Sequence, residues 1–501
     1  MKKNYTLIGI LSIFFFTACK KDFLNTSPTA SADSKTTFES VDNTYNVVNG
    51  IYRYLYSRYE QQNQPGHGGM MIQNDFMGED ITQAAATWYT SAGSGTGGYV
   101  THRNDQSGYV SYPFRLYYRV VGNANAVLDN IDAAIGDDNK RKIVKGEAFG
   151  LRAWAFHNLV QYFAKRYDGA NKPNSQPGIS LPLHANDIKL PKSTVEEVYA
   201  QINKDLDSAI VYLDAGSISP TPNKSHINKN TARALKARVA LTMQDYTTAI
   251  TYANQVISAT PGYTLMSIAD YQTGFNNILN SEWIWGAAII VDHADTFGSY
   301  FAQISYNGNT TYIRSRPKRI NSVLYNLIPA TDVRKKMWEP APNATNFPLP
   351  TTAFVREPLM SRKFSISAPN TTLGDVPYLR LSEVYLTLAE AYANTAGNEA
   401  MARTTLFNYV SKRDPSYVLS TNSGAALINE ILFHRRIELW GEGFRFFDLK
   451  RLNQALTRSA VPNYVSASVG GVMDVPAGDP RWQFVIPIAE IQANENIKQD
   501  Y

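Results

Sequence analysis

Residues 428–451 read INEILFHRRIELWGEGFRFFDLKR, which combines large apolar side chains with charged ones in a helical pattern. Apolar positions recur at helical spacing as far as Trp440, and this periodicity predicts a core helix. Gly441 and Gly443 then interrupt the pattern before an apolar face resumes at Phe444. We therefore predict a core helix with a kinked exit, around which the rest of the chain is organised.

Two carboxylates, Glu438 and Glu442, stand four residues apart on one face of this helix. Such a pair could serve as the general acid and base of a glycosidase. Arginines lie within a turn or two, however, and would hold both acids ionised, whereas a general acid needs a raised pKa. The sequence therefore favours a structural ion network over catalysis. The proposed members of that network are Arg435, Arg436, Glu438, Glu442, Arg445 and Asp448.

Within this stretch, the run R-R-I-E-L-x-x-E-G-F-R-x-x-D-L-x-R resembles the C-terminal signature of the SusD/RagB family. That family comprises surface lipoproteins that deliver nutrients to TonB-dependent transporters in the outer membrane of Bacteroidetes-type bacteria. The closing residues 487–501 also look like the last segment of the family. His434 stands where the family usually has glutamate, so we expect one partner of the usual ion network to be missing. In the family this signature is a structural element, which agrees with the interpretation of the two acids.

Helical periodicity recurs through much of the remaining chain and predicts helices at 38–59, 113–134, 143–165 and 194–213. The stretches 229–261 and 380–409 have the spacing of tetratricopeptide-like repeats. We therefore predict a mainly α fold, in which helix pairs stack into a tetratricopeptide-like scaffold with long irregular loop inserts and a few short strands. The family resemblance implies the same arrangement.

Two segments break the helical pattern. Residues 61–111 are rich in Gly, Gln, Ser and Thr, and residues 271–378 contain a short apolar run at 282–291 that predicts a buried strand. Long loops of this kind on a regular frame usually carry binding function. The glycine run SAGSGTGG lacks the Lys-Ser/Thr ending of a phosphate loop, so no nucleotide site is expected there.

Aromatic and polar side chains in these inserts suit a sugar ligand. A sugar ring presents an apolar face that stacks on tryptophan or tyrosine, and a rim of hydroxyls that Asp, Asn or Arg can bind. The resemblance implies a glycan site built in this way from comparable inserts. From composition, the predicted ligand-binding residues are Trp88, Tyr89, Asp80, Asn74, Tyr300, Phe301, Tyr306 and Trp338.

The N-terminus predicts export and lipid anchoring. A short positive region at 1–3, an apolar run at 7–16 and the small residues Thr17 and Ala18 precede Cys19, the sole cysteine of the chain. This pattern resembles a lipobox, in which the cysteine becomes the acylated N-terminus of the mature protein. We predict a signal peptide at 1–18, a flexible tether at 19–35 and a single SusD-like domain at 36–501. The expected location is the outer membrane, with the protein facing the exterior.

Several functional classes are disfavoured by composition and motifs. The 48 basic and 43 acidic residues give a mild net charge of +5 without a long basic run, so nucleic acid is not an expected partner. Common hydrolase, metalloprotease and nucleotide-binding motifs are absent. Asp292, His293 and Asp295 are too close in sequence to converge easily on a metal, and we interpret them as a solvated loop. Neither a metal nor a cofactor is expected.

The resemblance implies a non-catalytic, cell-surface lipoprotein that binds an oligosaccharide and delivers it to a SusC-like TonB-dependent transporter. Three alternatives remain open from the sequence. The ligand could be a peptide, as in family members of the RagB type. The chain could be a secreted glycoside hydrolase that uses Glu438 and Glu442, or a scaffold whose inserts bind nothing.

Overall fold

The computed structural model describes residues 34–90, 95–216, 223–260, 262–350, 353–369 and 371–499. The predicted signal peptide, Cys19 and nearly all of the predicted tether lie outside the described residues. Among those described, no helix combines the length and the apolar character that crossing a bilayer requires.

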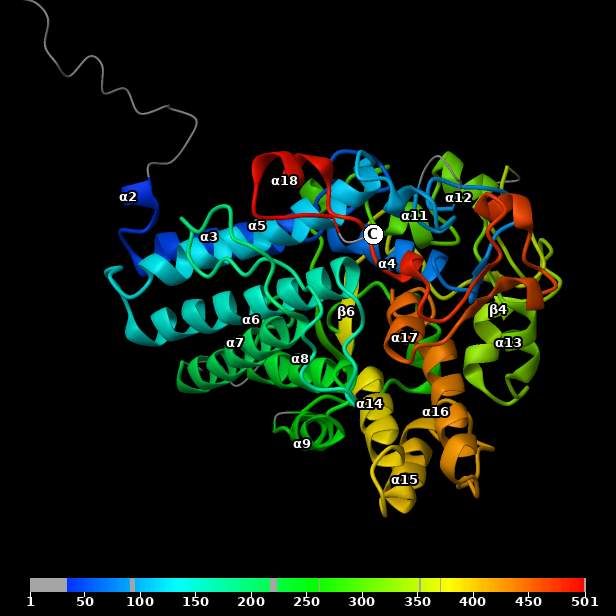
Figure 1. The fold of residues 1–501 in the computed structure, drawn as a ribbon. Helices are drawn as coiled ribbons and strands as arrows, with labels where there is room; N and C mark the ends of the chain where they lie inside the picture. The colour runs from blue at the N-terminus through cyan, green and yellow to red at the C-terminus, as the bar shows by residue number, and fades with distance from the viewer. Residues whose placement is uncertain are drawn as a thin grey trace, which may run out of the picture.

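Helices stack side by side to form the frame of the molecule, as predicted. From α5 to α9 each helix packs on the next, and α14 continues the array by packing on α8, α9, α15 and α16 (Figure 1). The frame is therefore one helical array interrupted by the segment between α9 and α14. Its helices are α3 (Val41–Tyr54), α5 (Gly108–Asn130), α6 (Asp138–Phe163), α7 (Val195–Ala215), α8 (Lys229–Thr242), α9 (Tyr246–Ile257), α14 (Leu381–Ala393), α15 (Glu399–Val410) and α16 (Gly424–Glu438).

Side-chain caps fix where these helices begin. At the start of α7, the Thr194 side chain accepts a hydrogen bond from the Glu197 backbone, and the Glu197 side chain accepts one from the Thr194 backbone. Asp137 caps α6 by accepting from Lys140, so this helix begins five residues before the predicted position of 143. The helices are thus where periodicity places them, while their ends depend on local capping.

The first insert contains a helix that the sequence analysis missed. Residues 61–111 were expected to be a loop, but α4 (Gly66–Phe76) lies within them and every one of its residues is buried. A helix that is buried on all sides has no polar face, so it shows no amphipathic period. Gly68 permits its close packing, because a Cβ atom there would lie 3.0 Å from side-chain atoms of Tyr300.

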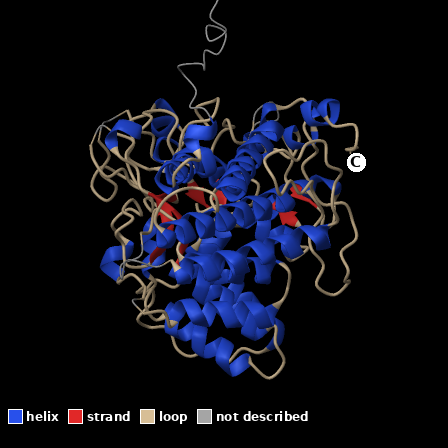
Figure 2. Ribbon diagram, turned by 90° about the vertical axis from the view of Figure 1, so that its left-hand side faces the viewer, coloured by secondary structure: helices blue, strands red, loops and turns tan. Residues whose placement is uncertain are grey.

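Short strands join the two inserts to each other and to the frame. Figure 2 shows that strands are a small part of a mainly helical molecule. The predicted strand at 282–291 is confirmed as the shorter β2 (Trp283–Ala287), which pairs antiparallel with β6 (Val376–Arg380). A second sheet has the order β1-β3-β5-β4 and takes β1 from the first insert and its other strands from the second. These strands are β1 (Ile81–Thr82), β3 (Arg319–Ile320), β4 (Trp338–Glu339) and β5 (Met360–Ser361).

Short helices and turns complete the second insert and the C-terminal region. Helix α10 (Ile268–Tyr271) leads into the second insert, which contains α11 (Phe301–Ile304), α12 (Thr311–Ser315) and α13 (Ser322–Leu327). Near the start and the end of the chain lie α2 (Ser34–Thr37), α17 (Arg445–Arg451), α18 (Ile488–Ala493) and a two-stranded sheet of β7 (Leu456–Thr457) and β8 (Asp474–Val475).

The kinked exit predicted for the signature stretch is confirmed. Helix α16 ends at Glu438, and α17 starts at Arg445 after a turn in which Gly441 and Gly443 adopt φ angles of +82° and +88°. Such positive φ angles are costly for residues with a Cβ atom. The turn packs on α4, where Asn74 Nδ2 donates to the Gly443 carbonyl at 3.2 Å and Asp75 accepts from the Gly443 backbone at 3.0 Å.

Candidate functional site

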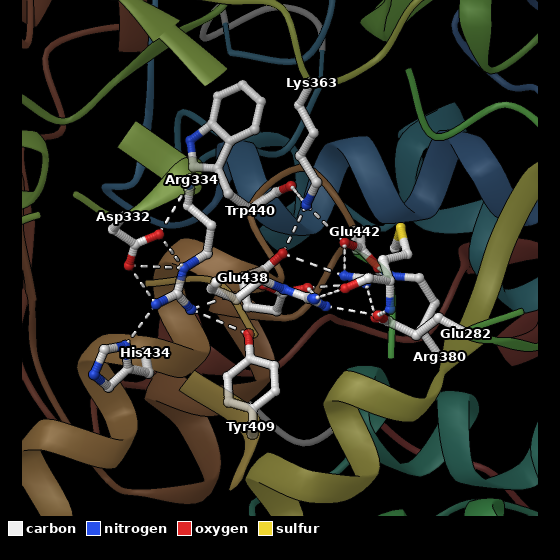
Figure 3. A network of polar contacts seen from close by, with 12 residues as sticks. Glu282, Asp332, Arg334, Lys363, Arg380, Tyr409, His434, Glu438, Trp440 and Glu442 are labelled. Carbon is white, nitrogen blue, oxygen red and sulfur yellow. Dashed lines mark hydrogen bonds and ion pairs between the residues drawn. The ribbon is translucent and has the colours of Figure 1, made fainter. Parts of the chain in front are cut away.

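The two acids of the signature stretch lie in a buried network of charges (Figure 3). Arg380 on β6 is at its centre, with guanidinium nitrogens 2.5 Å from Glu282, 2.9 Å from Glu438 and 2.6 Å from Glu442. Lys363 donates to Glu442 at 2.7 Å. The network therefore joins the segment just before β2, the end of β6, the segment just after β5 and the exit of α16.

The electrostatics of this network keep its acids ionised. Burial alone would raise the pKa of Glu442, but Arg380 and Lys363 outweigh burial and bring it below its usual value. The pKa of Glu438 lies well below its usual range, because Arg413, Arg380 and Arg334 likewise outweigh burial. Glu438 is fully buried and Glu442 is 6% exposed. These carboxylates thus lack both the proton of a general acid and open access to substrate.

The partners of these acids differ from those expected from local spacing. The arginines of the signature stretch bind other acids: Arg435 pairs with Asp448 at 2.8 Å, and Arg436 and Arg445 both pair with Glu79 of the first insert. His434, in the place of the usual glutamate, contacts Arg334 through Nδ1 at 2.8 Å. Distant segments supply the cations for Glu438 and Glu442, and a local sequence pattern cannot identify them.

A groove of about 470 Å³ opens between the two inserts and contains Trp88. The Trp88 side chain is 42% exposed, and its ring lies nearly parallel to that of Tyr312, at 7° and with the centroids 5.7 Å apart. Polar side chains surround this aromatic pair. The lining residues are Gln62, Ala86, Thr87, Trp88, Phe297, Gln303, Thr310, Thr311, Tyr312, Ser315 and Arg316.

Several elements hold the walls of this groove in place. Pairing of β1 with β3 brings the first insert against the segment that carries Tyr312. Thr310 caps α12 by accepting from the Ile313 backbone, which orients the helix that bears Tyr312. Gln303 Nε2 donates to the carbonyls of Gln62 at 3.0 Å and Phe297 at 2.8 Å, so it ties the two inserts together at the groove.

Of the eight predicted ligand residues, the structure places only Trp88 in the groove. Tyr306 is half-buried and packs edge-on against Phe347. The other six side chains are at most 3% exposed, so the structure gives them no surface for a ligand. These six are Asn74, Asp80, Tyr89, Tyr300, Phe301 and Trp338.

Their structural roles explain this burial. Asn74 and Asp80 bind the signature stretch, through the Gly443 carbonyl and the Arg436 guanidinium. The Tyr300 hydroxyl donates to the Gly441 carbonyl at 2.7 Å. The rings of Tyr89, Phe301 and Trp338 pack against Phe76, Phe364 and Trp440. Composition identified aromatic inserts, but it cannot distinguish an exposed ring from a packed one.

Sequence reasoning missed Tyr312, Phe297 and Arg316 as groove residues. The only feature of the sequence that could have identified Phe297 and Tyr312 is that they are aromatic residues of the second insert. Arg316 follows Tyr312 by four residues and carries the only charged side chain among the groove residues. Its place in the groove depends on α12, which is too short to be predicted from periodicity.

A larger cavity of about 580 Å³ lies elsewhere, between the end of α6, α17 and residues 478–483. Its one tryptophan, Trp482, is 6% exposed and donates to the Pro476 carbonyl at 2.7 Å. No exposed aromatic ring is therefore available there for stacking, and the Trp88 groove is the better candidate for a sugar.

The described residues contain no group of three His, Cys, Asp or Glu side chains arranged to hold a metal ion. In the 292–295 loop, His293 Nδ1 is 2.8 Å from the Tyr56 hydroxyl and Asp295 pairs with Arg58 at 3.2 Å. Both side chains thus have protein partners in the segment that follows α3.

Comparison with protein families covers nearly the whole chain. Residues 22–241 match a SusD-like family described as starch-binding and associating with the outer membrane, and residues 275–501 match the SusD family. The chain belongs to the SusD/RagB family. A relative in this family, the SusD-like protein P25 of Formosa agariphila, is 24% identical over 90% of both chains.

Solved structures share this SusD fold. A SusD-like carbohydrate binding protein of Bacteroides vulgatus is 25% identical and has a TM-score of 0.75, with 91% of this chain and 97% of that chain covered. A laminarin binding SusD-like protein is 18% identical and has a TM-score of 0.68 over 92% of this chain and 99% of that chain. The expected fold, a tetratricopeptide-like scaffold with irregular inserts, is confirmed.

Proposed function

We propose that this SusD/RagB protein binds an oligosaccharide in the groove at Trp88. The single observation that carries the proposal is the parallel, partly exposed Trp88–Tyr312 pair in a groove between the inserts. A sugar ring can lay its apolar face on such rings, which bring large apolar area at small conformational cost. The starch-binding description of the family and the carbohydrate-binding relatives support the same ligand class.

The rim of the groove supplies hydrogen bonds to hydroxyl groups. Gln62 and Thr311 are exposed and Arg316 is half-buried, so all three side chains reach solvent and can contact a ligand. A few polar groups around an apolar surface are typical of small-molecule sites, where the polar groups fix orientation. We propose these three side chains as hydrogen-bonding partners of the sugar.

The proposed activity is capture without cleavage. Glu438 and Glu442, which a glycosidase would need in its cleft, are buried in the ion network and ionised. Product analysis after incubation with each bound glycan tests this point. Cleavage that disappears in Glu442→Gln would contradict it.

We further propose that the mature protein is lipid-anchored at Cys19 and passes its ligand to a TonB-dependent transporter. The N-terminal pattern and the outer-membrane association of the family support this location. The Cys19→Ala chain should leave the membrane fraction, and its retention there would contradict lipid anchoring. Affinity purification from cells that co-express a SusC-like TonB-dependent transporter should recover that transporter.

Calorimetric binding of the full chain to a panel of oligosaccharides and peptides tests the ligand class. We expect a glycan to bind and Trp88→Ala to weaken that binding about tenfold or more, with no loss of melting temperature. Phe407→Ala is a matched control, because Phe407 stacks on Tyr417 on a distant part of the frame. Binding of peptides alone, or glycan binding that is unaffected by Trp88→Ala, would overturn the proposal.

A further inference from the structure

The Trp88 groove has an unbalanced charge. Arg316 lines it, and none of its lining residues is Asp or Glu. Arg316 belongs to residues 313–320, which read IRSRPKRI and contain four cationic side chains within six positions. These cations are Arg314, Arg316, Lys318 and Arg319.

Carboxylates of the protein neutralise only part of this charge. Arg319 pairs with Glu357 at 3.4 Å. Arg316 donates to the Ser315 carbonyl at 2.9 Å, and Arg314 donates to the Thr311 hydroxyl at 3.3 Å. Neither has a carboxylate within 4.0 Å among the described residues. The internal segments outside the description contain no Asp or Glu, so they cannot supply one.

Lys318 adds a buried amino group beside the aromatic pair. It is 4% exposed, and its Nζ lies 3.9 Å from the centroid of the Tyr312 ring. Within the described part of the chain this nitrogen has no hydrogen-bond acceptor. A buried polar group without a partner is costly, and a negative charge nearby would favour its protonated form. The groove is therefore short of negative charge at Arg316, and the amino group of Lys318 lies buried behind Tyr312 without an acceptor among the described residues.

We propose that the glycan bound in this groove is acidic, with a sugar ring on Trp88 and Tyr312 and its carboxylate or sulfate group on Arg316. This inference rests on the proposed function of the groove and names the ligand class. A guanidinium group offers parallel N–H donors that match the two oxygens of a carboxylate or sulfate, and such charge-assisted bonds are stronger than neutral ones. The absence of acids from the lining residues removes the repulsion that such a ligand would otherwise meet.

The arrangement also gives a reason for selectivity over neutral sugars. A neutral ring would gain the stacking contact but leave the guanidinium of Arg316 without an anion. An acidic ring gains both, and the positive field of residues 314–319 raises its rate of association at low salt. Discrimination therefore comes from Arg316, and general affinity for sugar rings from Trp88.

Matched pairs of probes test the inference on the full chain purified in detergent. Oligogalacturonate is compared with its methyl ester, oligoguluronate with its carboxyl-reduced form, and dextran sulfate oligosaccharides with unsulfated dextran. Neutral laminarin oligosaccharides complete the panel. Binding is measured by calorimetry at about 50 mM and about 300 mM NaCl, since exposed charge interactions weaken with salt.

We expect one acidic probe to bind at least tenfold more tightly than its neutral counterpart and to weaken in higher salt. Arg316→Gln should remove most of that preference and most of the salt dependence. Arg403→Gln should change neither, because Arg403 belongs to α15, which lies far from α12 in Figure 1. Comparison of the uronate pairs with the sulfate pair shows whether the groove recognises a carboxylate or a sulfate group.

Three results would overturn the inference in distinguishable ways. Equal binding of a neutral counterpart, lost in Trp88→Ala but unchanged in Arg316→Gln, would refute the acidic ligand and leave glycan binding standing. Failure of every glycan, acidic or neutral, to bind would refute the proposed function and this inference together. A preference for acid that persists in Arg316→Gln would show that the anion is bound elsewhere.

Discussion

Arg380 on β6 and Glu442 in the turn after α16 share two hydrogen bonds, of 2.6 and 2.8 Å, although 62 positions separate them in the sequence. The same guanidinium group also contacts Glu282 and Glu438. Arg380 thus joins the start of α14, the β2–β6 strand pair and the signature stretch. The network has a structural role in a SusD-type protein, and it predicts a large effect when Arg380 is removed.

We expect Arg380→Met to lower the free energy of unfolding by roughly 3–5 kcal/mol, because it leaves buried carboxylates without their central cation. Urea unfolding followed by circular dichroism measures this change. Arg403→Met removes a half-buried arginine whose carboxylate partner on the same helix, Glu399, has a side chain that is 39% exposed, and it should change stability by less than about 1 kcal/mol. Equal effects of the two variants would contradict the structural role of the network.

We expect Gly443→Ala to destabilise the protein for two reasons. Its φ angle of +88° is unfavourable for alanine, and a Cβ atom there would lie 2.6 Å from the Met71 Cα atom on α4. Gly397→Ala separates the two effects, because Gly397 has a φ of +82° with open space around its Cβ position. The control should cost about 1 kcal/mol and Gly443→Ala clearly more. Similar melting temperatures for both variants would show that the contact with α4 can relax.

The positions of Arg380 and Gly443 illustrate what the sequence could and could not predict. The break after Trp440 followed from two glycines in a helical pattern, because this is a local feature. Helix α4 and the pairing of Arg380 with Glu442 depend on contacts between distant segments, which no local pattern encodes.

The candidate site shows the same limit. Trp88 was identified by composition, whereas Tyr89, its neighbour in sequence, is fully buried against Phe76. Only the packing of the inserts decides which of two adjacent rings faces solvent. The sequence did not identify Arg316, because its position in the groove depends on the pairing of β1 with β3, which brings the two inserts together.

Buried histidines predict a loss of stability in acid. Burial lowers the pKa of His157 to about 3, against an ordinary value of 6.5. Between these values the unfolded chain holds a proton that the folded protein lacks, so folding is disfavoured progressively as the pH falls below 6.5. His157→Leu should make the loss shallower by up to about 1.4 kcal/mol per pH unit.

Chemical unfolding of both proteins at pH 7.5, 6 and 5 provides the comparison, since the other titrating groups are shared and cancel in the difference. Parallel stability curves for His157→Leu and the unmodified protein would mean that His157 is protonated in the fold.

Lys318 predicts the opposite kind of result, a substitution that stabilises. Burial lowers the pKa of its amino group well below the usual 10.5, and the amine has no hydrogen-bond acceptor among the described residues. Below pH 10.5 the unfolded chain binds a proton that the folded state resists, so this lysine destabilises the fold at neutral pH and less so as the pH rises toward 10.5. Lys318→Met keeps the chain length and removes the polar atom, and we expect it to raise the melting temperature at pH 7 by several degrees. The gain over the unmodified protein should shrink at pH 10.

Lys412→Met, on an exposed side chain, should have little effect at either pH. A lower melting temperature for Lys318→Met would show that the amine has a stabilising partner. The first partner to test is an acidic ligand carried through purification. Extensive dialysis against high salt, followed by a repeat of the measurement, makes this test.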